Sequence, residues 1–584
     1  MLFLAPFLLR FAPIGHGLPR NYVPDTHIVR GALGMAKDKT LVPPSNAYTT
    51  YPYLLPYALL PVYAGEYAAG RASGAWHGAE EFKLRLLEEP WIAQLPARLL
   101  VALFGALTPW LIWRAALAAA LSRRAALAAA WLVATSLLHV QFSTHERPWV
   151  PLVAFVALAL WPAALYAQSG RLRHLLLVGL AGAGGFSCHQ AGAPLLGLAG
   201  LAWLCGPAGW RGADLRRRLG HGAACVALFA VASLCAGYPF YLVHGGADGG
   251  TAAGEELMAK QQAEDPNAFG PTLKIGGQML ELKIRPESFA RLSRAFVGYD
   301  PLLLALGLLG LVAALRRRAL RAGAIFALGW AAFFLTQRND HVRYLLPLVA
   351  LLALPAGLAF EAAWSRFAAG GVRSLGGLAL VGALAFPLLQ AARLDWLLLQ
   401  PDTRELAERE LERTNGLGLV AVDRYAPQVE LDRASLERIE KWGEFGSRDE
   451  HRLAMLQAGA PTRAGAGLAV LPLERAWWFD DRAKTLLPKE KAVQPGEDLR
   501  AFLARHGATH VLLVSKRPQH VRDNPLLPLV DGAAPIWTID PAWRGLHPEE
   551  ATLPTEMEFP LTQLWQVERP GPALRLYALP RAGA

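Results

Sequence analysis

Residues 149–168, WVPLVAFVALALWPAALYAQ, form a run of twenty residues without an acidic or basic side chain. A helix of about 20 apolar residues spans the hydrocarbon core of a bilayer, so this stretch predicts a transmembrane helix. Similar runs recur on both sides of it as far as about residue 395. The whole chain is 53% hydrophobic and 18% charged over 584 residues, whereas soluble domains are about 25% charged. We therefore predict an α-helical multispan membrane domain over residues 1–398 and a soluble α/β domain over residues 399–584.

The apolar runs predict about 11 membrane helices. The first helix is short, because Arg10 and two prolines follow the apolar N-terminus, unless the true start lies upstream; no cleavable signal is expected. Two long external loops are expected at 15–96 and 244–299, with tyrosine- and proline-rich helices lying along the membrane surface within 48–94. The other spans are expected at 97–120, 125–142, 149–168, 175–190, 191–206, 221–243, 300–315, 322–337, 344–363 and 375–394.

The basic residues between the spans indicate the orientation of the chain. Five loops together carry fourteen arginines and one acid, Asp214. Alternation of the spans places these loops on one side, which the positive-inside rule assigns to the cytoplasm. The opposite, extracytoplasmic face then holds the other polar loops and the C-terminal domain. The net charge of +11 thus reflects membrane orientation and does not indicate binding of nucleic acid.

The four cysteines, Cys188, Cys205, Cys225 and Cys235, all lie in apolar stretches. The soluble domain has none, so no disulfide framework is expected there. In that domain, strands are predicted at 417–423, 467–471, 509–515, 563–568 and 573–579, the last two forming a hairpin. Helices are predicted from Asp402 to Gly416 and from Gly496 to His506.

Asp25 is the main candidate for a functional residue. An acidic side chain just outside the first membrane helix is costly near lipid and usually faces a water-filled cavity. The alternative is a helix N-cap before Ile28, and the two roles are compatible because a helix N-terminus stabilises the carboxylate anion. His27 and Arg30 share a helix face, which suits substrate binding or contact with lipid headgroups equally.

Two further outer turns concentrate polar side chains. The turn 143–149 contains His145 and Glu146, and it is either part of a site or simply a solvated turn. His189 follows Cys188 in a glycine-rich turn, but no ligand spacing for a metal surrounds it. We expect His189 to be a packed or phosphate-binding histidine.

A third turn, residues 338–344, places two arginines close to the membrane. Arg338 and Arg343 suit bidentate binding of a phosphate, and Tyr344 follows directly. The alternative is a salt bridge of either arginine with Asp340. Lys274, in the long loop 245–297, is a further cation suited to lipid phosphates.

Several common catalytic motifs are absent from the sequence. It has no Asp-x-Asp, no Walker A loop, no His-Glu-x-x-His and no Gly-x-Ser-x-Gly. Use of a soluble nucleotide sugar through a metal, and ATP-driven transport, are therefore disfavoured.

The order of short motifs resembles one family of membrane enzymes. The motifs are Pro24-Asp25-x-His27-x-x-Arg30, Tyr51-Pro52, Arg98-Leu99-Leu100, the turn 144–151, Arg343-Tyr344-Leu345-Leu346-Pro347 and Asp402-Thr403-Arg404-Glu405-Leu406-Ala407. Their order is similar to that in bacterial polyprenyl-phosphate-dependent glycosyltransferases of the GT-C superfamily, a group that includes protein O-mannosyltransferases and lipid A aminoarabinose transferases. The resemblance covers about residues 1–415.

The resemblance implies an inverting sugar transfer from a polyprenyl-phosphate donor to a hydroxyl group of a lipid, polysaccharide or protein, at the outer face of the bacterial cytoplasmic membrane. Asp25 matches the catalytic base of the family. Arg343 is the first candidate for the donor phosphate, followed by Arg338, Lys274 and His27. The chain departs from the family in having Thr26 after Asp25, Trp149 where a second acid is common, and His189 in place of a lysine. These departures weaken a two-carboxylate metal site, so no cofactor is expected with certainty, although a divalent metal stays open.

Two other functions remain compatible with the sequence. A transporter or flippase of lipid-linked sugars would use the same outer cavity, but it predicts charged residues at mid-membrane and an internal repeat, neither of which is evident. A non-catalytic scaffold for envelope assembly would act through the C-terminal domain.

Overall fold

A computed structural model of the chain describes residues 4–20, 22, 26–43, 49, 51–207, 209, 211–244, 272–275, 278–281, 284, 286–333, 342–369, 373–414, 416–459, 467–480, 485–515, 524–541 and 564–580. The chain divides into two compact units. Unit 1 comprises Met1–Ile14, Asp25–Ala68 and Ala93–Asp395, and unit 2 comprises Gly15–Pro24, Ala69–Ile92 and Trp396–Ala584. Each unit is described by itself.

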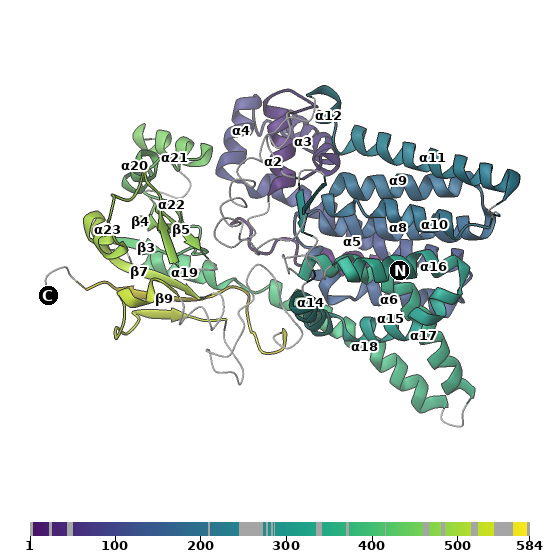
Figure 1. The fold of residues 1–584 in the computed structure, drawn as a ribbon. Helices are drawn as coiled ribbons and strands as arrows, with labels where there is room; N and C mark the ends of the chain where they lie inside the picture. The colour runs from purple at the N-terminus through teal and green to yellow at the C-terminus, as the bar shows by residue number, and fades with distance from the viewer. Residues whose placement is uncertain are drawn as a thin grey trace. The chain divides into compact units, whose positions relative to one another are not determined.

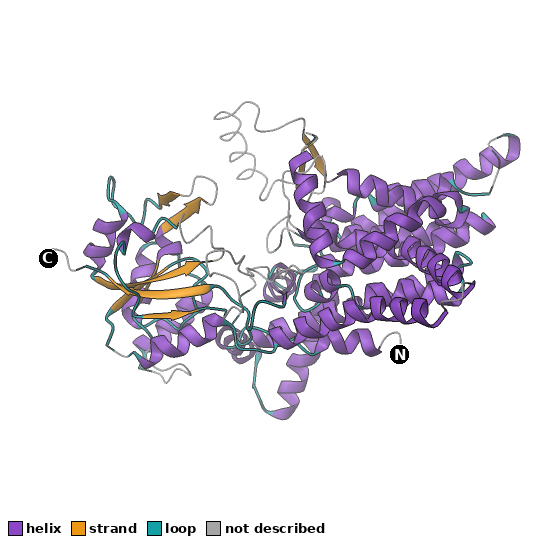
Figure 2. Cartoon of the chain, turned by 90° about the horizontal axis from the view of Figure 1, so that it is seen from below, coloured by secondary structure: helices purple, strands orange, loops and turns teal. Residues whose placement is uncertain are grey.

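Unit 1 is a helical bundle (Figures 1 and 2). Its helices before residue 244 are α1 (Leu4–Phe11), α2 (His27–Lys37), α3 (Leu54–Ser73), α5 (Trp91–Ala118), α6 (Arg123–Ala134), α7 (Leu137–Phe142), α8 (Trp149–Ser169), α9 (Leu172–Cys188), η1 (Gln190–Gly192), α10 (Leu195–Leu204), α11 (Gly212–Ala236) and α12 (Phe240–Val243). A small hairpin of β1 (Thr272–Ile275) and β2 (Gln278–Glu281) follows, and then α14 (Pro286–Tyr299), α15 (Pro301–Arg316), α16 (Arg318–Phe333), η2 (Val342–Leu345), α17 (Leu346–Ala369) and α18 (Arg373–Leu398).

The chain is an α-helical membrane protein with a helix at every predicted span, but fewer helices pass a strict test of length and apolarity. Within the described ranges, five helices are long and apolar enough to cross a membrane, or six if the bent pair α14–α15 counts as one span. The predicted helix at 125–142 is broken into α6 and α7, and α5 begins at Trp91 rather than at residue 97. Pro61 lies inside α3, which continues through it from Leu54 to Ser73.

Helix α17 is central to the bundle and packs against α6, α8, α15 and α16. Two glycines permit these close approaches. A Cβ added at Gly310 of α15 would lie 1.8 Å from the carbonyl oxygen of Pro355, and one at Gly357 would lie 2.5 Å from that of Ala125. Small residues at helix interfaces allow such backbone contact in membrane bundles.

Unit 2 contains a five-stranded mixed sheet in the order β4-β3-β7-β9-β8. Strands β4 (Val470–Pro472), β3 (Leu419–Val422) and β7 (Ala508–Ser515) are parallel, whereas β9 (Ala573–Ala578) pairs antiparallel with both β7 and β8 (Trp537–Ile539). The remaining elements are α4 (Ala79–Glu88), α19 (Thr403–Arg413), α20 (Arg433–Lys441), α21 (Ser447–Gln457), α22 (Leu473–Ala476), α23 (Leu499–His506), η3 (Leu527–Leu529) and a hairpin of β5 (Trp477–Asp480) and β6 (Thr485–Pro488).

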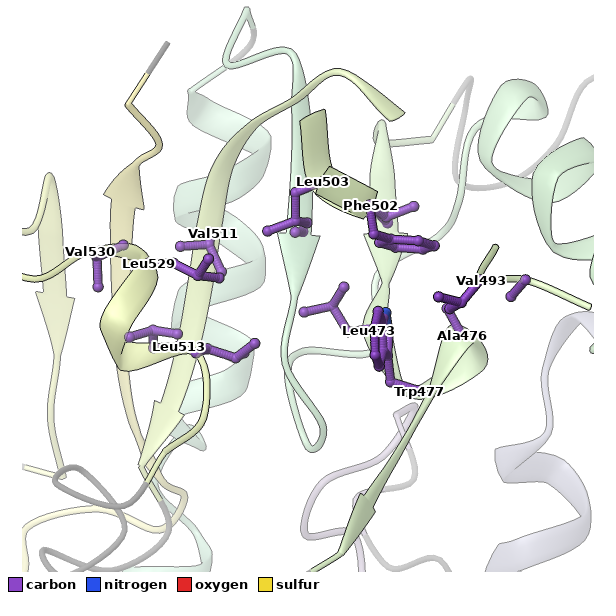
Figure 3. Packing of buried hydrophobic residues seen from close by; sticks show 14 of the residues in the cluster. Leu473, Ala476, Trp477, Val493, Phe502, Leu503, Val511, Leu513, Leu529 and Val530 are labelled. Carbon is purple, nitrogen blue, oxygen red and sulfur yellow. The ribbon is translucent and has the colours of Figure 1, made fainter. Parts of the chain in front are cut away.

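Alternating side chains of the sheet build two hydrophobic layers. Val420, Val422, Leu512 and Val514 pack with α19 on one face. Ala421, Val511 and Leu513 face the opposite layer, which includes Phe502 and Leu503 of α23 (Figure 3). This period-two alternation produces the predicted α/β domain with helices on both faces of the sheet.

The predicted strands at 417–423, 467–471, 509–515 and 573–579 match β3, β4, β7 and β9 within a few residues. The strand predicted at 563–568 is wrong, since the described residues 564–568 form a turn with one bridge residue, Val567; the partners of β9 are β7 and β8. The two predicted helices are α19, capped by Asp402, and α23, which ends at Gly507 with φ of 71° as expected for a left-handed cap. All four cysteines are free.

Candidate active site

The break between α6 and α7 is built from polar side chains. Ser136 caps α7, because its Oγ accepts the N–H of His139 at 3.2 Å. The Ser136 hydroxyl donates to Asp300 Oδ2 at 2.8 Å, and Asp300 Oδ1 accepts the N–H of Leu137 at 2.9 Å. Backbone groups freed by the break therefore have partners, as a buried helix end requires. Sequence periodicity predicted one helix here because this polar stabilisation comes from a residue far along the chain.

Arg10 of α1 holds the other side of the same break. Its buried guanidinium donates to the carbonyl oxygens of Val133 and Ala134 at 3.3 and 3.1 Å, at the end of α6. It also donates to Ser143 Oγ at 3.2 Å and to His139 Nδ1 at 2.9 Å, so this ring nitrogen must be the acceptor. Arg10 thereby ties the end of α6 to the turn that follows α7.

The turn 143–149 is buried. Ser143, Thr144, His145 and Glu146 are each 0% exposed and Trp149 is 1% exposed, so the alternative of a solvated turn is wrong. Thr144 Oγ1 lies 2.6 Å from His145 Nδ1. The turn is a packed part of unit 1 whose polar side chains need protein partners.

Glu146 forms a buried ion pair with Arg98 of α5. Arg98 Nε donates to Glu146 Oε2 at 2.8 Å, and both side chains are 0% exposed. Arg98 Nη1 also donates to the carbonyl oxygen of Ile14 at 3.0 Å. The pair therefore fixes the turn against α5 and against the end of the first chain segment of unit 1.

A line of rings connects five chain segments, one of them this turn. His27 contacts Tyr51 edge-on with centroids 5.2 Å apart, and Tyr51 lies 5.1 Å from His189. Trp149 lies 4.1 Å from His189 and contacts Tyr344 edge-on at 5.0 Å. His27, Tyr51 and Tyr344 are half-buried, whereas His189 and Trp149 are buried. We call these five residues the aromatic cluster.

Local structure places the members of the aromatic cluster. Tyr53, two residues after Tyr51, is buried and its N–H donates to the carbonyl oxygen of Gly237 at 3.0 Å. His189 ends α9, and its Nδ1 accepts the N–H of Ala191 at 2.9 Å. Arg343 is half-buried and directly precedes Tyr344 in the chain. An aromatic surface with a cation beside it suits a sugar bearing a phosphate.

An apolar cavity lies among α14, α15, α16 and α17. Its volume is about 320 Å³, and Leu345 of η2, two residues after Arg343, forms part of its wall. The other walls include Leu292, Phe296, Leu308, Ala331 and Leu352. The cavity has the hydrophobic lining that an isoprenoid or acyl chain requires.

One known protein family matches part of the chain. Residues 92–235 match the dolichyl-phosphate-mannose-protein mannosyltransferase family, and this stretch contains Arg98, Glu146, Trp149 and His189. The match covers 144 of the 584 residues. No curated protein matches it.

The solved structures to which the chain is similar are distant from it. The archaeal oligosaccharyltransferase AglB from Archaeoglobus fulgidus, in complex with an inhibitory peptide and a dolichol-phosphate, is 12% identical, with 88% of this chain and 68% of that one covered and a TM-score of 0.43. ArnT from Cupriavidus metallidurans bound to undecaprenyl phosphate is 15% identical over 100% and 97% of the two chains, with a TM-score of 0.39. The arabinofuranosyltransferase AftD from Mycobacteria is 17% identical over 99% and 41%, also at 0.39. These similarities are too low to transfer residue roles.

Not all residues that the sequence predicted for the site belong to the aromatic cluster. His27, His189 and Tyr344 are in it, Arg343 is adjacent, and Arg30 is exposed on α2. The N-cap of α2 is Thr26. Asp25 and Arg338 lie outside the described residues; Lys274 lies in β1, and its side chain is likewise not described. His145 and Glu146 are buried beneath the surface, and their contact with substrate stays a prediction.

The sequence did not single out Tyr51, Trp149, Arg98 or Arg10 as site residues, although the first three lie in the short motifs quoted above. Arg10 had one available signal, a charge interrupting an apolar run. Among the described residues, no group of three or more His, Cys, Asp or Glu side chains is arranged to hold a metal ion.

Proposed function

We propose that the chain transfers a sugar from a polyprenyl-phosphate donor to a hydroxyl acceptor, with Asp25 as base, at the outer face of the bacterial cytoplasmic membrane. The observation that carries the proposal is the aromatic cluster. Its five residues come from five chain segments, and three of them were predicted from the sequence as substrate-binding; neighbouring ring centroids lie within 5.2 Å of each other. Hydrophobic packing alone does not require histidine and tyrosine at such a junction.

The reaction is a single displacement. The acceptor hydroxyl loses its proton to the Asp25 carboxylate while its oxygen forms a bond to C1 of the sugar. The bond from C1 to the phosphate oxygen breaks, and the electron pair leaves with polyprenyl phosphate, so the configuration at C1 inverts. The phosphate is already a good leaving group, and the protein must chiefly orient the acceptor and neutralise charge on the phosphate.

We assign the two parts of the donor, its phosphate and its isoprenoid chain, to Arg343 and to the apolar cavity. The Arg343 guanidinium suits the phosphate, and Leu345 on the same short helix lines the cavity that suits the isoprenoid chain. The sugar would then lie against Tyr344 and Tyr51, which are half-buried and supply flat faces and hydroxyl groups. Arg338, Lys274, His27 and Arg30 remain candidates for further phosphate contacts.

Transfer from radiolabelled polyprenyl-phosphate sugars in isolated membranes tests the proposal. Asp25→Asn should abolish covalent transfer at unchanged protein level, because the amide cannot take the proton. Asp38→Asn is the matched control, since it makes the same change at an exposed position at the end of α2, and it should retain activity. Detergent-solubilised protein should still form product, which a flippase would not. Full activity of Asp25→Asn would refute the assigned base, and the absence of product from every donor would refute the enzyme.

A further inference from the structure

Unit 2 contains a second cleft, which the proposed transfer reaction does not use. It is open, has a volume of about 570 Å³, and lies between α20, α23 and the loop 490–495. The volume falls within the range of about 300–1,000 Å³ that is common for small-molecule sites. It is too large for a bare phosphate ion and suits a molecule the size of a mono- or disaccharide.

Basic side chains dominate the lining of the cleft. Arg438 and Lys441 come from α20 and Lys491 from the loop, and no described residue forms an ion pair with any of them. Arg505 also lines the cleft, but Glu497 binds it at 2.6 Å. The cleft therefore offers three cations to an incoming ligand.

Two acids line the same cleft. Glu437 binds Arg433 at 2.7 Å, which offsets its charge. Glu490 also lines the cleft and repels an anion, but carboxylates accept hydrogen bonds from hydroxyl groups as well. A lining with cations in excess and carboxylates among them fits a ligand that carries both negative charge and hydroxyls.

Two buried nitrogens on lining residues lack partners. Arg438 Nη1 and His506 Nε2 make no hydrogen bond within the described part of the chain. A buried donor without an acceptor costs free energy, more so on a charged group. An anionic ligand in the cleft would supply the missing acceptor to Arg438.

The hydrophobic core of unit 2 fixes the walls of the cleft. His506 contacts Phe502 at 4.6 Å and Trp442 at 5.6 Å between ring centroids. Phe502 and Val493 belong to the buried layer shown in Figure 3. Because α23 and the loop 490–495 are anchored in this layer, the cations that they carry are held on a rigid support, as a specific site requires.

We propose that this cleft binds a sugar bearing a phosphate or carboxylate group. Such a sugar would be part of the acceptor glycan or glycolipid. Only this assignment of the ligand as an acceptor rests on the proposed function. Binding itself does not depend on Asp25, so the two proposals can fail separately.

Binding to the full-length protein in phosphatidylcholine nanodiscs tests the site. Glucuronic acid and glucose 6-phosphate should bind with similar affinity, and methyl glucoside, which is neutral, should bind much more weakly. Arg438→Gln and Lys491→Gln should each weaken binding roughly ten- to hundred-fold, the loss expected for a hydrogen bond to a charged group. Glu490→Gln should strengthen binding, because it removes the repelling charge. Asp25→Asn should leave the affinity unchanged.

Arg500→Gln is the matched control. It removes one positive charge from α23 outside the cleft and should not change the affinity. Lys491 is exposed, so Lys491→Gln is expected to fold. This variant keeps the test decisive if Arg438→Gln does not fold. Equal losses in Arg500→Gln and Lys491→Gln would overturn the proposal, as would failure of both charged sugars to bind. Loss of sugar binding in nanodiscs that contain phosphatidylglycerol would assign the cleft to lipid headgroups instead.

Discussion

Removing one partner of the buried Arg98–Glu146 pair should destabilise unit 1 strongly. Both side chains are 0% exposed and their contact is 2.8 Å. Breaking a buried pair by deleting one partner costs about 3–5 kcal/mol, because a charge stays buried without its counter-ion. Arg98→Ala should cost more than Glu146→Gln, since the amide can still accept a hydrogen bond from Arg98. At about 2 °C per kcal/mol, the low end for large domains, Arg98→Ala should lower the melting temperature by roughly 6–10 °C.

The double variant Arg98→Met/Glu146→Leu distinguishes an ion pair from general packing. It buries no charge and should recover much of the loss, since apolar replacements of buried pairs are often neutral or stabilising. Thermal unfolding of purified protein in one detergent measures all variants. The exposed pair Lys83–Glu80 is the control, and Lys83→Ala should change stability by less than about 1 kcal/mol. Additive losses in the double variant, or a loss below about 1 kcal/mol in Arg98→Ala, would refute this account of the turn.

Three further predictions concern other parts of the chain. Ser136→Ala should cost about 2 kcal/mol in thermal unfolding, because it removes the cap of α7 and a hydrogen bond to Asp300. Gly310→Leu should reduce the yield of folded protein, measured by gel filtration, because its Cβ would meet the carbonyl oxygen of Pro355; an unchanged yield would show that α15 and α17 are farther apart. Burial and two neighbouring arginines lower the pKa of His506 to about 4, so the fold favours the neutral ring. Its contribution to stability should be complete above about pH 6.5 and should decrease as the pH falls toward 4, and His506→Gln should remove this pH dependence.

The sequence predicted the elements of the fold that depend on local pattern. Apolar runs located the helices of unit 1, and period-two alternation located β3, β4, β7 and β9. The broken helix α6–α7 was not predicted, because Arg10 and Asp300 stabilise the break from distant positions in the chain. The predicted hairpin of 563–568 with β9 was wrong for a similar reason. Strand pairing across the sheet depends on tertiary packing, which the turn residues alone do not reveal.

The sequence predicted part of the site. The polar residues there fall into two groups that differ in the exposed fraction of their side chains. Arg10, Arg98 and Glu146 are 0% exposed and bind backbone or each other, so they hold the turn in place. His27 and Arg343 are half-buried and lie in or beside the aromatic cluster. The sequence singled out Glu146 from the first group and both residues of the second, since charge beside a membrane span is unusual in either case.

The two groups should differ in what their substitution changes. A residue that holds the turn in place contributes through stability, so its variants should lose folded protein, while the protein that remains folded should keep its affinity for the donor. A residue that contacts the donor should show the opposite pattern. Arg343→Gln should leave the melting temperature within about 1 °C of wild type, because a half-buried surface charge contributes little to stability. It should nevertheless weaken donor binding roughly ten-fold or more, as loss of a charge-assisted phosphate contact does. If Arg343→Gln instead unfolded the protein and left donor affinity intact, Arg343 would belong with Arg10 and Arg98, and the phosphate would have to bind elsewhere.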